Sequence, residues 1–171
     1  NNFAITGCEA DFRMDPHSVS ARKLKVQTPY STLDADLDLQ YSSLATLLDS
    51  VQFSNLNLDL RNLSFKNSDL LYFKPDLIAQ PFFKNASNIT IISGKISGQM
   101  NNLNAKNLSV RTGVNTLIET DFTIKGLPEV KTAFYDFPNL SIISGKKDIV
   151  MMAGPYIHDS IDIPENISMQ V

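Results

Sequence analysis

Two histidines, His17 and His158, are the residues of the chain best suited to general acid–base chemistry. A serine hydrolase needs a serine held by a histidine that a carboxylate orients. His17 follows Pro16 in a polar segment, and the chain has no G-x-S-x-G pattern that would place a nucleophilic serine at a strand-to-helix turn. We therefore interpret both histidines as surface residues and expect no enzymatic activity.

Three carboxylates, Asp34, Asp36 and Asp38, would share one face of a strand and could attract a hard cation. Calcium loops instead place their ligands on a sharply turning backbone that usually contains glycine. The single cysteine excludes an internal disulfide and a cysteine-based metal site. Gly94 and Gly98 are not followed by the Gly-Lys-Ser/Thr of a phosphate loop. We expect a solvated strand face, no metal and no cofactor.

Cys8 ends the segment Ile5-Thr6-Gly7-Cys8, which fits the small-residue pattern that precedes a lipid-modified cysteine in bacterial lipoproteins. A signal peptide needs a basic start and an apolar stretch, and residues 1–4 supply neither. The segment also resembles Ile96-Ser97-Gly98. We interpret Cys8 as part of a strand end, with lipidation as the alternative.

The composition excludes several classes of function. The chain has 171 residues, enough for one domain with a core, and a net charge of -3. It has no basic cluster interleaved with aromatic residues, so we expect no nucleic-acid partner. No apolar run approaches the roughly 18 residues of a membrane span. Any membrane association is therefore expected through an anchor outside this segment.

The central stretch, residues 88–124, alternates apolar residues with Ser, Thr, Asn and Lys, and Gly94, Gly98 and Gly113 interrupt the alternation. This pattern predicts four short strands and no helix. Residues 55–65 alternate as strongly, but their phase changes at Arg61-Asn62. The change indicates a bulge and would place Leu63 and Phe65 on the face opposite to the preceding leucines.

Three segments have helical patterns. Residues 42–49 begin with serine and place leucines at i, i+3 and i+4. Residues 69–80 carry an aspartate near the start of an apolar segment that Pro75 is expected to bend or divide. A weaker counterpart is expected at residues 148–152.

Much of the chain repeats. A set of residues between positions 21 and 33 recurs later at one constant offset, as Ala21, Leu24, Val26, Thr28, Thr32 and Leu33 match Ala105, Leu108, Val110, Thr112, Thr116 and Leu117. Further matches occur at slightly shorter offsets, such as Asp69-Leu70 with Asp148-Ile149. We expect units at 20–103 and 104–171, the second truncated, within one internal fragment of a longer array. Stacked units favour an elongated, curved, antiparallel-type sheet with short helices, an all-β fold with an apolar interior.

Alternation also defines one apolar face of this sheet. Its candidate residues are Leu37, Leu39, Leu56, Leu58, Leu60, Leu108, Val110, Ile118, Phe122 and Ile124. In an open, curved sheet these side chains would line a groove suited to acyl chains, which need no hydrogen bonds. In a closed β-sandwich the same side chains would be sealed as core. The pattern allows both.

Several of these segments resemble the repeating segment of the TamB and AsmA-like family of Gram-negative bacteria. The matching residues are Ile96-Ser97-Gly98, Leu103, residues 107–113 (NLSVRTG), Thr116-Leu117-Ile118 and residues 123–128 (TIKGLP). Residues 69–75 and Asp148-Ile149 resemble the short helical insert of the family, and the likeness extends over most of the chain from about Ala21.

The resemblance implies a non-catalytic segment of a periplasmic protein that is anchored in the inner membrane through a part outside this segment. Its β-groove would shield the acyl chains of phospholipids that move between the inner and outer membranes. It also implies an outer-membrane partner of the β-barrel assembly type, again contacted outside this segment. The alternative is a structural or adhesive β-repeat module with a closed core and no lipid ligand.

Overall fold

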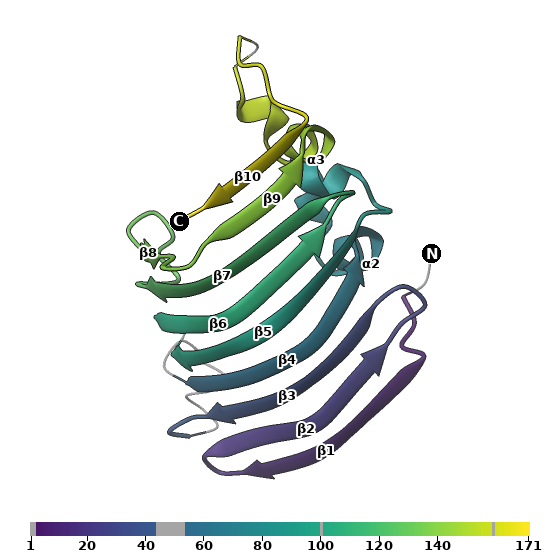
Figure 1. The fold of residues 1–171 in the computed structure, drawn as a ribbon. Coiled ribbons are helices and arrows are strands. Elements are labelled where there is room, and N and C mark those ends of the chain that lie inside the picture. The colour runs from purple at the N-terminus through teal and green to yellow at the C-terminus, as the bar shows by residue number, and fades with distance from the viewer. Residues whose placement is uncertain (1–2, 44–53, 100, 159) are drawn as a thin grey trace.

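The computed structural model describes residues 3–43, 54–99, 101–158 and 160–171. These residues form one open, antiparallel sheet in the order β1-β2-β3-β4-β5-β6-β7-β9-β10, with β8 paired to β7 alone (Figure 1). The strands are β1 (Gly7–Asp15), β2 (Ser18–Gln27), β3 (Thr32–Gln40), β4 (Asn55–Lys66), β5 (Ile89–Gln99), β6 (Asn102–Thr112), β7 (Thr116–Lys125), β8 (Phe134–Asp136), β9 (Ser141–Gly145) and β10 (Asn166–Gln170). The predicted elongated, all-β fold is confirmed, and the sheet does not close into a sandwich.

The helical segments are short and follow β4 and β9. They are α2 (Asn67–Phe73), η2 (Pro75–Ala79), η3 (Pro81–Lys84), α3 (Lys146–Ala153) and η4 (Gly154–Tyr156). Pro75 divides the first helical segment, as predicted. The counterpart is present as α3 and η4, and it is shorter than the segment that α2, η2 and η3 form together. The helix predicted at residues 42–49 falls largely on residues 44–53, which lie outside the described residues. Among the helices described, none has the length and apolar character needed to cross a membrane.

The prediction of four short strands in residues 88–124 is wrong, because three long strands, β5, β6 and β7, occupy this stretch. Gly94 and Gly98 lie inside β5 instead of ending it. The bulge predicted at Arg61-Asn62 is confirmed by a register shift, but it has the opposite effect on Leu63. Leu60 pairs with Ala35 and Leu63 pairs with Leu33, and these two partners lie on the same face of β3. The extra residue therefore returns Leu63 to the face of Leu60.

Strand registers give the sheet one apolar face and one predominantly polar face. A row of directly paired residues crosses five strands on the apolar face, through Leu37, Leu58, Ile96, Ala105 and Phe122. A corresponding row crosses the polar face through Ser93, Ser109, Glu119 and Ser141.

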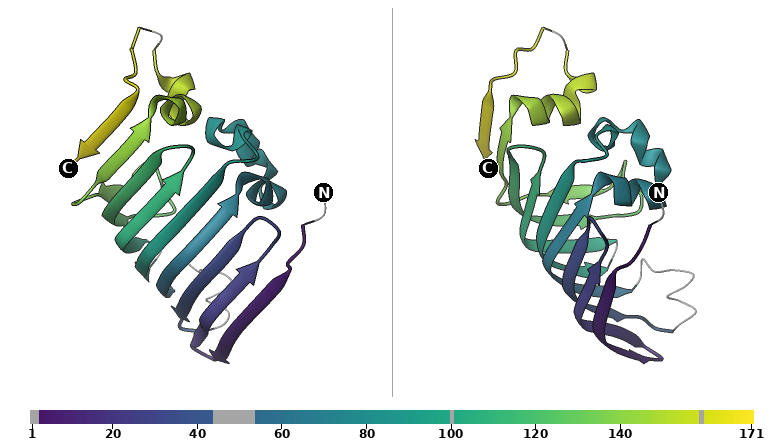
Figure 2. Two further views of the ribbon diagram at one scale, coloured as in Figure 1. Left: turned by 45° about the vertical axis from the view of Figure 1, so that its right-hand side comes forward. Right: turned by 90° about the vertical axis from the view of Figure 1, so that its right-hand side faces the viewer.

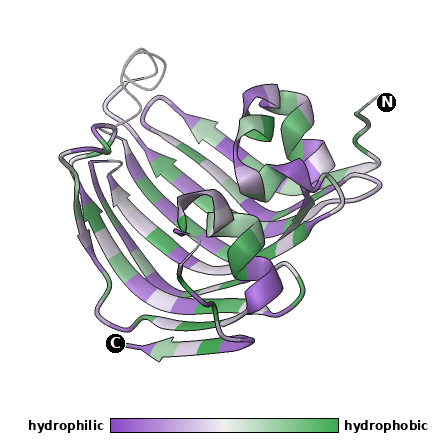
Figure 3. Cartoon of the chain, turned by 90° about the horizontal axis from the view of Figure 1, so that it is seen from above, coloured by the Kyte–Doolittle hydropathy of each residue, from purple (hydrophilic) through white to green (hydrophobic). Residues whose placement is uncertain are grey.

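The apolar face is the concave one. Asp148, in the first turn of α3, accepts a hydrogen bond from the hydroxyl of Thr116, which lies on the same face of β7 as Ile118. The helix therefore begins on the apolar side of the sheet. Figure 3 shows the helical segments inside the curve of the sheet, and Figure 2 shows the curvature from two further sides.

A line of register shifts crosses the sheet and accounts for its bend. Each neighbouring strand pair from β1–β2 to β6–β7 has one shift, and each shift is adjacent to the next. Bulges bend strands and increase their twist. The backbone takes the left-handed conformation at Lys23 (φ 50°) and at Asn107 (φ 51°), which occupy equivalent positions in the two repeat units. Their N–H groups donate to Asp36 at 2.7 Å and to Asp121 at 2.8 Å, so the same bulge recurs along the chain.

The concave side of this bend holds small residues. Ala35 and Ala105 are completely buried, with 0% exposure. Gly94 adopts φ +144°, and a Cβ atom added there would lie 2.8 Å from the Cα atom of Leu108. Larger side chains would have to displace the neighbouring strand backbone. The inside of the bend therefore combines these small residues with one buried leucine, Leu60, which pairs with Ala35 and Gly94.

The end of the concave face that carries the helices is anchored by a buried carboxylate. Asp148 is 2% exposed and accepts hydrogen bonds from the N–H of Val114 at 2.9 Å, from the N–H of Asn115 at 2.7 Å and from the Thr116 hydroxyl at 2.9 Å. Burial raises the pKa of Asp148, but the Val114 and Asn115 N–H donors and the Thr116 hydroxyl together outweigh it and leave the pKa below its ordinary value. Asp148 therefore joins α3 to the turn between β6 and β7.

We predict that Ala105→Leu lowers the free energy of unfolding by about 1–3 kcal/mol, because the added atoms overpack the inside of the bend. Urea denaturation of the full chain measures the change. Ala86→Leu, at an exposed position, is the matched control and should change stability by less than about 0.5 kcal/mol. Equal effects of the two substitutions would contradict this account of the bend.

We predict that Asp148→Ala lowers the free energy of unfolding at pH 7 by about 2–3 kcal/mol, because buried N–H donors lose their acceptor. A carboxylate with a lowered folded-state pKa contributes stability above its unfolded pKa of about 3.9 and loses it as the pH falls through the folded value. The difference between wild type and variant should therefore shrink below about pH 4 in urea titrations at several pH values. Asp136→Ala, at an exposed position, is the control. A difference that did not change with pH would refute the role of the Asp148 charge.

Candidate functional site: the concave apolar face

All the residues predicted to line the apolar side lie together on the concave face of the sheet. The pairs Leu37–Leu58 and Leu39–Leu56 join β3 to β4 directly, and Val110 pairs with Ile118 between β6 and β7. Leu60, Leu108, Phe122 and Ile124 complete the set through the same registers. The sequence thus predicted one continuous surface from residues that are spread along the chain from Leu37 to Ile124.

The apolar side chains of this face are only partly buried. The buried apolar residues in the described part of the chain are Ala21, Ala35, Tyr41, Leu60 and Ala105. The remaining predicted lining residues are all half-buried. The accessible surface is 11073 Å², whereas a compact monomer of 19.0 kDa is expected to expose about 8,400 Å². The chain is therefore less compact than a globular monomer of its mass, and the helices leave most of the predicted lining residues half-buried.

Sequence reasoning missed several residues of the same face. They are Leu33, Leu63, Phe65, Ile92, Ile96, Leu103 and Ile142. Counting every second residue from Leu37 and from Leu108 identifies further concave-face residues on stretches without a bulge, such as Leu33. Leu63 and Phe65 lie beyond the β4 bulge, so that counting by twos assigns them to the wrong face.

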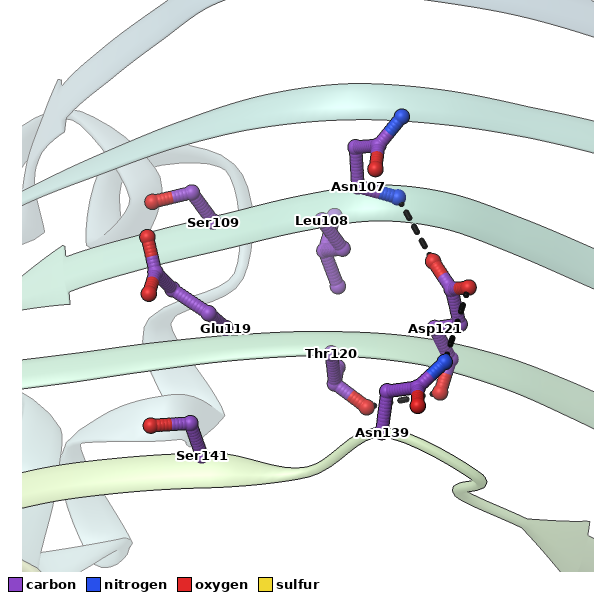
Figure 4. Close-up of a pocket in the computed structure, with 8 residues that line it drawn as sticks. All are labelled: Asn107, Leu108, Ser109, Glu119, Thr120, Asp121, Asn139 and Ser141. Atoms are coloured by element: carbon purple, nitrogen blue, oxygen red, sulfur yellow. Dashed lines mark hydrogen bonds between the residues drawn. The ribbon is translucent and has the colours of Figure 1, made fainter. Parts of the chain in front are cut away.

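The polar convex face has its own hollow, of about 300 Å³ (Figure 4). Asp121 lies in it and is held by the N–H of Asn107 at 2.8 Å, by Lys106 at 3.0 Å and by the Asn139 amide at 3.3 Å. The Asn107 N–H and then Lys106 hold the pKa of Asp121 below its ordinary value. This carboxylate is charged and engaged in fixing the bulge, so it is not poised to take up a proton.

The residues first considered for chemistry lie apart from the concave face or are engaged in ion pairs. His17 and His158 are exposed, as predicted. His17 Nδ1 lies 2.9 Å from the carbonyl oxygen of Ser42, and His158 Nδ1 lies 2.9 Å from the hydroxyl of Ser160. Within the described ranges, no group of three His, Cys, Asp or Glu residues is placed to hold a metal ion.

The three aspartates of β3 pair with arginines on the convex face. Arg61 donates to Asp34 at 2.7 Å and lies 3.1 Å from Asp36, and Arg22 pairs with Asp38. The pKa of Asp36 is lowered chiefly by the N–H of Lys23 and then by Arg61. These carboxylates stabilise the polar side of the bend.

The concave face thus offers a long, weakly polar surface without a constellation suited to catalysis among the described residues. Comparison of the chain with protein-family models, with curated proteins and with solved structures found no match.

Proposed function

We propose that this chain is a non-catalytic segment that shields lipid acyl chains on its concave face, within a periplasm-spanning protein that carries phospholipid between the inner and outer membranes. One observation carries the proposal. The apolar face is continuous across the sheet, yet most of its Leu, Ile, Val and Phe side chains are only half-buried. A continuous apolar face of this length that the chain covers only in part favours a partner or ligand.

Acyl chains fit this surface better than polar ligands do. The row through Leu37, Leu58, Ile96 and Phe122 presents no charged side chain and runs across the strands, along the direction in which the sheet extends. Each CH₂ group removed from water contributes roughly 0.8 kcal/mol. A bound chain would be held measurably but reversibly, and its head group would stay in water. Such a segment is passive, so the energy for directed movement comes from elsewhere.

The resemblance to TamB and AsmA-like proteins is a second support. It favours a periplasmic location, an inner-membrane anchor and an outer-membrane partner of the β-barrel assembly type, all provided by parts outside this segment. The open edges of β1 and β10, each paired on one side only, are compatible with a longer array that continues the sheet. A structural or adhesive repeat would instead need the concave side chains to be sealed.

Neighbouring residues that face opposite sides of one strand give a matched test. A photo-crosslinking amino acid replaces Leu108 on the concave face or Ser109 on the convex face of β6. The proteins are irradiated with phospholipid vesicles, and adducts are identified by mass spectrometry. We expect lipid adducts at position 108 at least about tenfold above those at position 109, because only the former faces the bound chain.

The same replacement is made at Ile118 or Glu119, a second pair on opposite faces of β7. It shows whether the labelling difference depends on the strand chosen. Circular dichroism confirms that each variant is folded. Equal labelling on both faces, or no labelling on either, would overturn the proposal.

A further inference from the structure

A second hollow, of about 300 Å³, lies where β2 ends and α2 begins. Its lining includes the side chains of Phe3, Thr28, Tyr30, Ser68, Asp69 and Tyr72. Thr28 closely follows Val26, which faces the concave side of β2 opposite Leu33. The hollow therefore lies beside the end of the concave face that carries the helices.

Aromatic rings dominate this hollow. Phe3 stacks on Tyr72 with ring centroids 5.4 Å apart, and Phe73 meets the Phe3 ring edge-on at 4.6 Å. Tyr30 and Tyr72 remain 59% and 57% exposed. The faces of aromatic rings attract organic cations such as ammonium groups.

The carboxylate of Asp69 has binding capacity that its repeat counterpart, Asp148, lacks. Asp69 Oδ2 accepts hydrogen bonds from the hydroxyls of Thr28 at 2.7 Å and Ser31 at 2.6 Å, while Oδ1 has no hydrogen-bond donor among the described residues. Both oxygens of Asp148, the counterpart in the second repeat unit, are occupied by backbone N–H donors. The Ser68 hydroxyl is also buried without a partner in the described part of the chain.

A positive charge lies beside Tyr30, one of the aromatic residues that line the hollow. Lys66 Nζ lies 4.3 Å from the centroid of the Tyr30 ring. A bare cation would be repelled by this lysine, and a bare anion by Asp69. A ligand that carries both charges matches the two groups together.

We propose that this hollow binds an ammonium–phosphate zwitterion of the phosphoethanolamine type. Its ammonium group lies against Asp69 Oδ1 and the rings of Phe3 and Tyr72, and its phosphate faces Lys66. The inference rests on the proposed function for the source of this group, the head group of a zwitterionic phospholipid. The hollow at the corresponding place in the second half of the chain is lined by residues that include Val114, Asn115, Lys147 and Asp148 and contains no aromatic ring, so the site belongs to the first half alone.

Native mass spectrometry of the full chain with an equimolar mixture of phosphatidylethanolamine and phosphatidylglycerol of identical acyl chains tests the proposal. We expect an ethanolamine preference of about tenfold, because Asp69 and the aromatic rings contact only the ammonium group, whereas both lipids carry the phosphate that faces Lys66. Asp69→Asn and Tyr72→Ala should each reduce the preference to about twofold or less. Tyr156→Ala, at a 75% exposed tyrosine outside the hollow, is the aromatic control and should retain it. Thermal unfolding verifies that each variant is folded.

Soluble phosphoethanolamine, titrated by NMR, separates the sources of the ligand. Binding of both lipids without preference, and no binding of phosphoethanolamine, would overturn the head-group site while leaving the acyl-chain proposal intact. Binding of phosphoethanolamine that is lost in Asp69→Asn, with no binding of either lipid, would support the site for a free zwitterion and overturn the acyl-chain proposal. A preference that survives both Asp69→Asn and Tyr72→Ala would refute the residues assigned here.

Discussion

The bend of the sheet is the constraint on which the rest of the structure depends. A line of bulges crosses the sheet, with aspartate-bound N–H groups on its convex side and small residues on its concave side. Because the bulges also shift the side-chain phase, they keep the apolar residues on either side of the bend on one face. Curvature and the apolar surface therefore have the same origin. Without the bulges, Leu63 and Phe65 would face the convex side.

The two faces of the bent sheet carry different chemical groups. Arginine–aspartate and lysine–aspartate pairs lie on the convex face, where water screens them and their contribution to stability is small. Hydroxyl and carboxylate groups gather at the end of the concave face that carries the helices, as in the Thr90–Thr112 contact of 2.8 Å. The middle of the concave face is left to apolar side chains. This division suits a ligand with a long apolar part and a polar end.

The sequence predicted the fold class, the single apolar face and the division of the first helical segment at Pro75, because these depend on local periodicity and on proline geometry. It failed where an effect depended on neighbouring strands. Gly94 signals a strand break in the sequence, but in the sheet its missing side chain admits the backbone of Leu108. The hollow around Asp69 was not predicted either, because Phe3, Tyr30 and Tyr72 come from three distant segments. No pattern within one segment indicates that convergence.

Lipid extraction from the purified chain, combined with native mass spectrometry, tests the central claim most directly. Wild type is compared with Leu58→Asp on the concave face and Asn57→Asp beside it on the convex face of β4. The account predicts phospholipid bound to wild type and to Asn57→Asp, and its loss from Leu58→Asp in protein that stays folded. Lipid-free wild type, together with an unfolded Leu58→Asp variant, would mean that these leucines form a sealed core and would contradict an acyl-chain function.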